Sequence, residues 1–144
     1  MSASDEPFAH PPKGGASSAA ASAGRLSQLE FDIAFYESVL QRAPDYVDVL
    51  RCQGELLTRK GSHAQALAID KRLAALLPDD CVVQYNLACS LALMGMRREA
   101  IAALRCALEA GYDDFDYLEA DSDLDALRDE GAYQALLREF LPKE

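Results

Sequence analysis

Five pairs of landmark residues recur along this sequence at one 34-residue spacing. They are Pro44 and Pro78, Gly61 and Gly95, Ala66 and Ala100, Leu57 and Leu91, and Leu67 and Ile101. Self-similarity at a fixed period of about 20–50 residues indicates stacked copies of one supersecondary unit. The spacing therefore predicts a repeat fold, in which each copy buries its apolar face against its neighbours.

The first complete copy has the pattern of two helices joined by a tight turn. Apolar residues at helical spacing predict helices over residues 47–60 and 62–77. Gly61 is placed to end the first helix in a left-handed conformation, and Ser62 can cap the second. Pro78 then stops the second helix.

The second copy repeats this plan further along the chain. It has predicted helices over residues 81–94 and 96–110, with Gly95 as the turn between them. One more helix over residues 26–43 precedes the first copy and ends before Pro44. Because Pro44 ends that helix as Pro78 ends the later one, we interpret it as the second helix of an incomplete unit.

The two ends of the sequence differ from the repeats. The first 24 residues are rich in Ser, Ala, Gly and Pro and predict a disordered tail without the pattern of a signal peptide. Beyond an acidic, irregular stretch, Asp121 or Ser122 can cap a short helix, and a last helix starts at Gly131 or Ala132 and ends at Pro142. A stack of hairpins exposes an apolar flank at each end, and we expect the terminal helices to cover these flanks.

These patterns give an all-α chain of about seven helices in three parts. The parts are a disordered tail over residues 1–24, helical repeats over residues 25–112 (helix 26–43, unit 47–78, unit 81–111), and acidic capping helices over residues 113–144.

The charge of the chain argues against a nucleic-acid partner. The formal net charge is −10, and residues 113–144 alone carry 3 Lys or Arg against 11 Asp or Glu. Phosphate binding needs clustered Lys and Arg, so we expect neither nucleic acid nor an anionic membrane surface as a partner. The acidic end either attracts a basic partner or is a solvated surface.

The remaining composition favours a cytoplasmic protein without a cofactor. The four cysteines form no CxxC pair and fall within predicted helices, so we expect reduced thiols and no zinc site. No stretch approaches the ~20 apolar residues of a membrane span. The sequence also suggests no Ser/His/Asp or Cys/His arrangement, so we do not expect an enzyme.

The repeat units resemble the tetratricopeptide repeat, a 34-residue unit with the pattern W-x₂-L-G-x₂-Y…A-x₃-F…P. The residues that carry the resemblance are Tyr85-Asn86-Leu87-Ala88, Leu91, Gly95, Glu99-Ala100-Ile101 and Leu104 in the second unit, and Leu50, Gly54, Leu57, Ala66 and Pro78 in the first. The first unit departs at Gln53 and Asp70, where the family has apolar residues, and Asp32 stands where a small residue is usual. The C-terminal segment looks like the tail of small bacterial members.

The resemblance implies a short right-handed α-solenoid of antiparallel helix hairpins with terminal capping helices. It also implies a non-catalytic adaptor or scaffold that binds a peptide or helix in a concave groove lined by the first helix of each unit. Carried over by position, the groove residues are Asp48, Arg51, Glu55, Thr58 and Arg59 in the first unit, and Val82, Tyr85, Asn86, Cys89, Ala92 and Leu93 in the second.

One half of this groove is charged and the other is apolar, which favours an amphipathic or basic protein segment as the ligand. Two alternatives stay open at this point. Arg51, Glu55 and Arg59 can pair with each other at helical spacing and bind nothing. The chain can also be a structural homo-oligomer, or a fixed subunit of a larger assembly, that makes contact through its end flanks.

Two local patterns imitate other sites. Residues 121–125 begin like a calcium-binding loop, but Ala126 and Ala132 stand at the sixth and twelfth positions, where Gly and a bidentate Glu are needed. Cys89 lies on the groove helix without a sequence neighbour that would lower its pKa, so we interpret it as a side chain that fills space.

Overall fold

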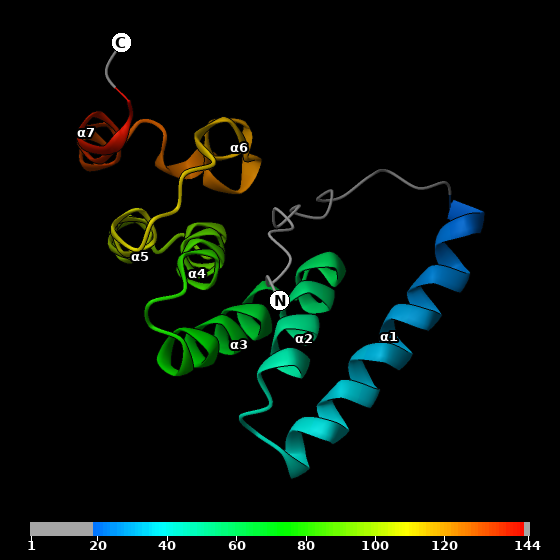
Figure 1. Ribbon diagram of the computed structural model, residues 1–144. Helices are drawn as coiled ribbons and strands as arrows, with labels where there is room; N and C mark the ends of the chain where they lie inside the picture. The colour runs from blue at the N-terminus through cyan, green and yellow to red at the C-terminus, as the bar shows by residue number, and fades with distance from the viewer. Residues whose placement is uncertain (1–18, 143–144) are drawn as a thin grey trace, which may run out of the picture.

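The fold is all-helical, as the sequence predicts. The computed structural model describes residues 19–142, and these residues contain helices and no strand (Figure 1). The elements in chain order are α1 (Ala19–Arg42), α2 (Val47–Lys60), α3 (His63–Leu76), α4 (Cys81–Leu93), α5 (Arg97–Glu109), α6 (Phe115–Ala120), the 3₁₀ helix η1 (Ser122–Leu127) and α7 (Gly131–Phe140).

The structure differs from the sequence prediction at two helix boundaries. Helix α1 begins at Ala19, so residues 19–24 of the predicted disordered tail are helical, and the rest of that tail lies outside the described residues. Alanine has the highest helix propensity, and four of the five residues from Ala19 to Ala23 are alanine. The stretch that we expected to be irregular contains α6, because the carboxylate of Asp114 caps it by accepting a hydrogen bond from the amide of Tyr117 at 3.1 Å.

Each helix in the first part of the chain packs on the next one. Helix α1 packs on α2, α2 on α3, α3 on α4 and α4 on α5, and the C-terminal elements return to this body, with η1 against α4 and α7 against α5 (Figure 1). The N-terminal half of α1 extends beyond the helices that it contacts (Figure 1). The two ends of the helix series are thus unequal: α6, η1 and α7 follow the last hairpin, whereas no described element precedes α1.

Backbone hydrogen bonds recur at the 34-residue spacing of the sequence landmarks. The amides of Ser62 and Met96 each donate to a carbonyl five residues earlier, at 2.9 Å in both cases. The amides of Gly61 and Gly95 donate to carbonyls three residues earlier, at 3.0 Å in both cases. Both glycines have positive φ angles, 84° and 75°, which only glycine adopts without strain. The two turns are therefore built in the same way.

Small residues let the paired helices approach closely. Ala66 and Ala100, which are one repeat apart, are both buried, as is Gly54 on the facing helix α2. A Cβ atom added to Gly54 would lie 3.3 Å from Oδ1 of Asp70, so there is little room for a side chain. The sequence landmarks at these positions mark the closest contacts between helices.

The two polar departures from the family pattern lie buried between helices and form hydrogen bonds. The Nε2 group of Gln53 on α2 donates to the backbone carbonyl of Ile33 on α1 at 3.1 Å. The hydroxyl of Ser90 on α4 donates to the carboxylate of Asp70 on α3. Buried polar groups need such partners to offset their loss of hydration, so both residues connect consecutive helices.

The largest core lies at the C-terminal end. It joins α4 and α5 to the C-terminal elements through fully buried leucines, which are Leu104, Leu118, Leu124, Leu127 and Leu136. Two smaller clusters fill the N-terminal half, one around Leu57 between α1, α2 and α3 and one around Leu50 between α2, α3 and α4. The C-terminal elements are therefore part of the folded body and cover its last hairpin.

We predict that Ala100→Arg unfolds or strongly destabilises the protein, because Ala100 is 0% exposed between α4 and α5. Overpacking and burial of an unpaired charge together cost more than about 3 kcal/mol of unfolding free energy. Urea denaturation followed by circular dichroism measures this change. The matched control is Ala102→Arg, which places the same side chain on the exposed face of α5 and should change the unfolding free energy by less than about 0.5 kcal/mol. Equal stability of the two variants would contradict the helix packing described here.

Candidate protein-binding surface

The structure divides the expected groove residues into a buried set and an exposed set. Tyr85 and Cys89, expected to face a ligand, are buried, and so is Ala92. Asp48, Glu55, Arg59, Asn86 and Leu93 are exposed, and Arg51, Thr58 and Val82 are half-buried. The prediction for Tyr85 and Cys89 is therefore corrected: neither side chain is available to an external ligand.

The physical reason for this burial is that the C-terminal segment occupies the apolar half of the expected groove. The hydroxyl of Tyr85 donates a hydrogen bond to Oδ2 of Asp121 at 2.7 Å. The ring of Tyr85 stacks on that of Tyr112 with centroids 4.3 Å apart and contacts the edge of Tyr117 at 6.0 Å. The aromatic residue that we assigned to a ligand thus binds the chain's own C-terminal segment.

Asp121 joins the segment to α4 through several donors. Its Oδ2 accepts from the Tyr85 hydroxyl and lies 3.5 Å from Sγ of Cys89, and its Oδ1 accepts from the amide of Asp123 at 3.0 Å. Burial raises the pKa of Tyr85, and the neighbouring Cys89 and the hydrogen bond to Asp121 raise it further. The phenol therefore keeps its proton and remains a hydrogen-bond donor throughout the neutral pH range.

The same carboxylates bear on the two metal-site patterns. Cys89, Asp121 and Asp123 each have a ligand-type atom within 4.8 Å of the others. Asp121, however, already accepts the hydrogen bonds that cap η1 and fix Tyr85, so its oxygens have structural roles. The segment that imitates a calcium loop forms the 3₁₀ helix Ser122–Leu127, which places its acidic residues in a helical turn.

The charged half of the groove forms ion pairs. Arg51 on α2 binds Oδ2 of Asp80 at 2.8 Å, and Arg59 binds Glu55 one helical turn earlier at 2.7 Å. The alternative in which all three of our groove charges pair with each other is thus met for Glu55 and Arg59, whereas Arg51 crosses to the start of α4. Exposed pairs of this kind contribute about 0.2–1 kcal/mol, so a ligand carboxylate can compete for these guanidinium groups.

Asp80 connects the two first helices of the units. Its Oδ1 accepts from the amides of Val82 and Val83 at 3.0 and 3.1 Å, which caps α4. Partial burial raises the pKa of Asp80, but the hydrogen bonds from Arg51 and the two amides and the charge of Arg51 outweigh it, so the pKa lies below its ordinary value of 3.8. The carboxylate is therefore charged at neutral pH and holds Arg51 in place.

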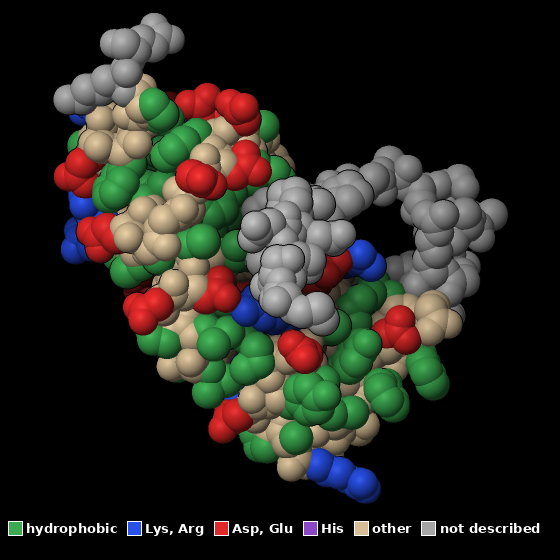
Figure 2. All heavy atoms as spheres, in the orientation of Figure 1, with side chains coloured by type: hydrophobic (Ala, Val, Ile, Leu, Met, Phe, Trp, Pro, Cys, Tyr) green, Lys and Arg blue, Asp and Glu red, His purple; other side chains and the backbone are tan. Residues whose placement is uncertain are grey.

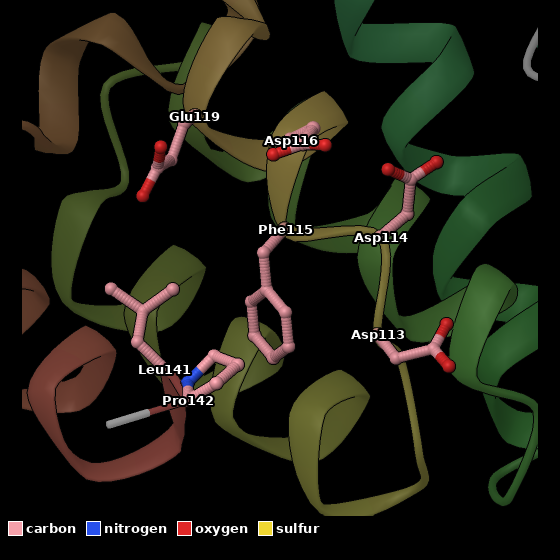
Figure 3. A pocket seen from close by; sticks show the side chains of 7 residues that line it. All are labelled: Asp113, Asp114, Phe115, Asp116, Glu119, Leu141 and Pro142. Carbon is pink, nitrogen blue, oxygen red and sulfur yellow. The ribbon is translucent and has the colours of Figure 1, made fainter. Parts of the chain in front are cut away.

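An acidic hollow of about 310 Å³ lies at the C-terminal end. The side chains of Phe115, Leu141 and Pro142 point toward one another and form its apolar part (Figure 3). The carboxylates that line it come from Asp113, Asp114, Asp116 and Glu119. Sequence analysis found the negative charge of this region, but it did not show that α6 and the end of α7 would enclose an apolar floor.

Exposed apolar side chains occur on several helices. Phe31 and Phe35 on α1 are 67% and 56% exposed, and Leu93 and Met94 at the end of α4 are 36% and 42% exposed. Figure 2 shows hydrophobic side chains interspersed with charged ones over much of the visible face. Among the described residues, no helix is long and apolar enough to cross a membrane.

Comparison with known proteins gives one partial similarity. No family model matches the sequence, and no solved structure matches it. The chain is similar to part of a chloroplast protein of Arabidopsis thaliana, with 29% identity over 91 residues. The match covers 61% of this chain and 27% of that protein, so the chain spans about a quarter of the length of this relative.

We predict that Tyr85→Phe lowers the unfolding free energy by about 1–3 kcal/mol, because it removes the hydroxyl that Asp121 accepts from and leaves a buried carboxylate with one donor fewer. Chemical denaturation measures the change. Tyr46→Phe removes the same atom from an exposed ring and serves as the control, with an expected change of less than about 0.5 kcal/mol. A Tyr85→Phe protein as stable as the wild type would show that this hydrogen bond does not hold the C-terminal segment.

We also predict a pH-dependent contribution from Asp80. Because its folded-state pKa is lowered, the carboxylate stabilises the fold above pH 3.8, and this stability is lost as the pH falls through the folded-state pKa. Arg51→Gln removes one cause of the shift, so the difference in unfolding free energy between wild type and variant should reach up to about 1 kcal/mol at pH 7 and shrink at pH 2–3. Thermal denaturation over this pH range tests the sign; a difference that grows toward low pH would contradict it.

Proposed function

We propose that this protein is a short α-solenoid of the tetratricopeptide type that binds another protein and has no catalytic role. The observation that carries the proposal is the recurrence of one hairpin geometry at the 34-residue spacing, with equal hydrogen bonds at Gly61 and Gly95 and fully packed small residues at Ala66 and Ala100. A series of hairpins that each contact mainly the next one presents long, preformed faces, which suit the binding of an extended segment or a helix.

The binding surface in this proposal is narrower than the one expected from the family pattern. Because the C-terminal segment fills the part of the groove over Tyr85 and Cys89, the open part consists of the exposed face of α2 and the adjoining edge of α4. This surface offers the guanidinium groups of Arg51 and Arg59 and the amide of Asn86. These groups fit a segment that carries a carboxylate and backbone groups free to form hydrogen bonds.

The preformed surface supports binding on physical grounds. The ion pairs of Arg51 and Arg59 hold both guanidinium groups in defined positions before a ligand arrives, so little side-chain entropy remains to be lost on binding. The Glu55 carboxylate beside Arg59 also selects against a purely acidic ligand, since an excess of negative charge would be repelled. An amphipathic protein segment with mixed charge satisfies both conditions.

We predict that Arg51→Gln with Arg59→Gln weakens partner binding about tenfold or more while the helix content stays unchanged. The matched control is Lys71→Gln with Arg98→Gln, which removes the same charge from exposed positions on α3 and α5 and should leave binding within about twofold of the wild type. Affinity capture from the lysate of the source organism, with quantitative mass spectrometry of each eluate, identifies proteins retained by wild type and control but lost from the groove variant.

Two outcomes would overturn this proposal. Proteins retained equally by all three baits would remove the groove from the binding surface. A bait that recovers only itself, and that light scattering sizes as a dimer, would favour the structural homo-oligomer, which makes contact through the end flanks.

A further inference from the structure

Helix α1 carries an apolar face that no described element covers. Phe31, Ala34, Phe35 and Ser38 are all exposed and stand at spacings of three and four residues, so they share one side of the helix. The opposite side of α1 packs against α2 through Ile33. Two phenylalanines one helical turn apart form an apolar stripe of the kind that binds another helix.

The repeat register identifies what this face is built to contact, and this step depends on the repeat fold proposed above. At the 34-residue spacing, Phe35 corresponds to Ile69 on α3 and to Ala103 on α5. Ile69 packs toward α2, its Cγ2 atom lying 3.4 Å from the place of a Cβ at Gly54, and Ala103 is buried. In a complete unit this position therefore contacts the first helix, whereas Phe35 has no described helix beside it.

The chain itself cannot supply the absent helix in register. Helix α2 spans Val47–Lys60, and the residues one repeat earlier are 13–26. Helix α1 already begins at Ala19, so most of that window belongs to α1. The six positions left, 13–18, amount to fewer than two helical turns, which is too short to cover the stripe from Phe31 to Ser38.

The charges around the stripe indicate the chemistry of the helix that would cover it. Glu30 and Glu37 are exposed beside the two phenylalanines, and both are acidic. Asp32 stands where Ala66 and Ala100 make the closest helix contacts in the complete units, and it accepts a hydrogen bond from Gln28 at 2.8 Å. A second copy of this face would bring like charges together, whereas Lys or Arg residues on another helix would pair with them.

We propose that this face of α1, formed by Phe31, Ala34, Phe35 and Ser38, binds a basic amphipathic helix of another protein. The bound helix takes the place of the first helix of the incomplete unit. Its apolar side packs on Phe31 and Phe35, and its Lys or Arg residues pair with Glu30, Asp32 and Glu37.

The test uses a phage-displayed library of helix-forming peptides about 20 residues long, with apolar residues fixed on one face and all other positions random. Wild-type protein selects peptides, and fluorescence anisotropy measures the affinity of each selected peptide for wild type and variants. We expect the selected peptides to carry net positive charge and to bind Phe31→Gln with Phe35→Gln at least about tenfold more weakly than wild type. We expect Asp32→Asn to weaken the binding of the same peptides, because it removes a charge that faces the basic helix.

Two controls make the result specific. Leu93→Gln with Met94→Gln removes an equal number of exposed apolar side chains from the end of α4 and should leave the affinity within about twofold. The groove variant Arg51→Gln with Arg59→Gln should also bind normally, so that failure of the groove proposal and failure of this one are distinguishable. Gln suits the α1 variant because it is a good helix former and occupies the position equivalent to Phe31 in the next unit, Gln65.

Three outcomes would overturn the proposal. The first is a selection that yields no peptides beyond those selected by the Phe31→Gln, Phe35→Gln protein. The second is a set of selected peptides that are neutral or acidic, or that bind this variant as tightly as wild type. The third is a wild-type dimer, measured by light scattering, that the same variant converts to a monomer, which would assign the face to a second copy of the chain.

Discussion

The close approach of the two helices within each hairpin is the contact on which the rest of the structure depends. Ala66 and Ala100 are completely enclosed, one repeat apart, and a side chain larger than alanine at either position would separate the helices that it joins. Once two helices are held at this distance, their outer faces are too apolar to remain in water, so each hairpin needs a neighbour. The order of packing, from α1 to α5, follows from this need rather than from any single strong bond.

The two ends of the series meet this requirement in different ways. At the C-terminal end, η1 and α7 supply buried leucines, and the hydrogen bond from Tyr85 to Asp121 fixes η1 on α4. That bond also sets the limit of the groove, because a tyrosine engaged with the chain's own segment cannot contact a ligand. At the N-terminal end Phe31 and Phe35 stay exposed on α1. The same apolar requirement is thus met within the chain at one end and left unmet among the described residues at the other.

Sequence patterns predicted the helices better than they predicted the site. Glycines with positive φ and prolines are local signals, so the turns at Gly61 and Gly95 and the helix ends before Pro44 and Pro78 could be placed from the sequence. The burial of Tyr85 depends on a contact 36 residues away in sequence, and no local pattern encodes such a contact. The available signal was the acidic residue that caps η1, but a capping aspartate and an aspartate that binds a buried tyrosine look identical in a sequence.

Charge separates the surfaces on which the two proposals rest. The open groove presents Arg51 and Arg59, whereas the rim of the α1 stripe presents Glu30 and Glu37, and the hollow at the far end is lined by four carboxylates. A partner drawn to one of these surfaces by charge is repelled from the others, and the strength of this selection falls as salt screens exposed charges. A single partner that contacts both groove and stripe must therefore carry separate acidic and basic segments. Such a division of charge in a partner sequence would distinguish simultaneous contact with the two surfaces from independent binding to each.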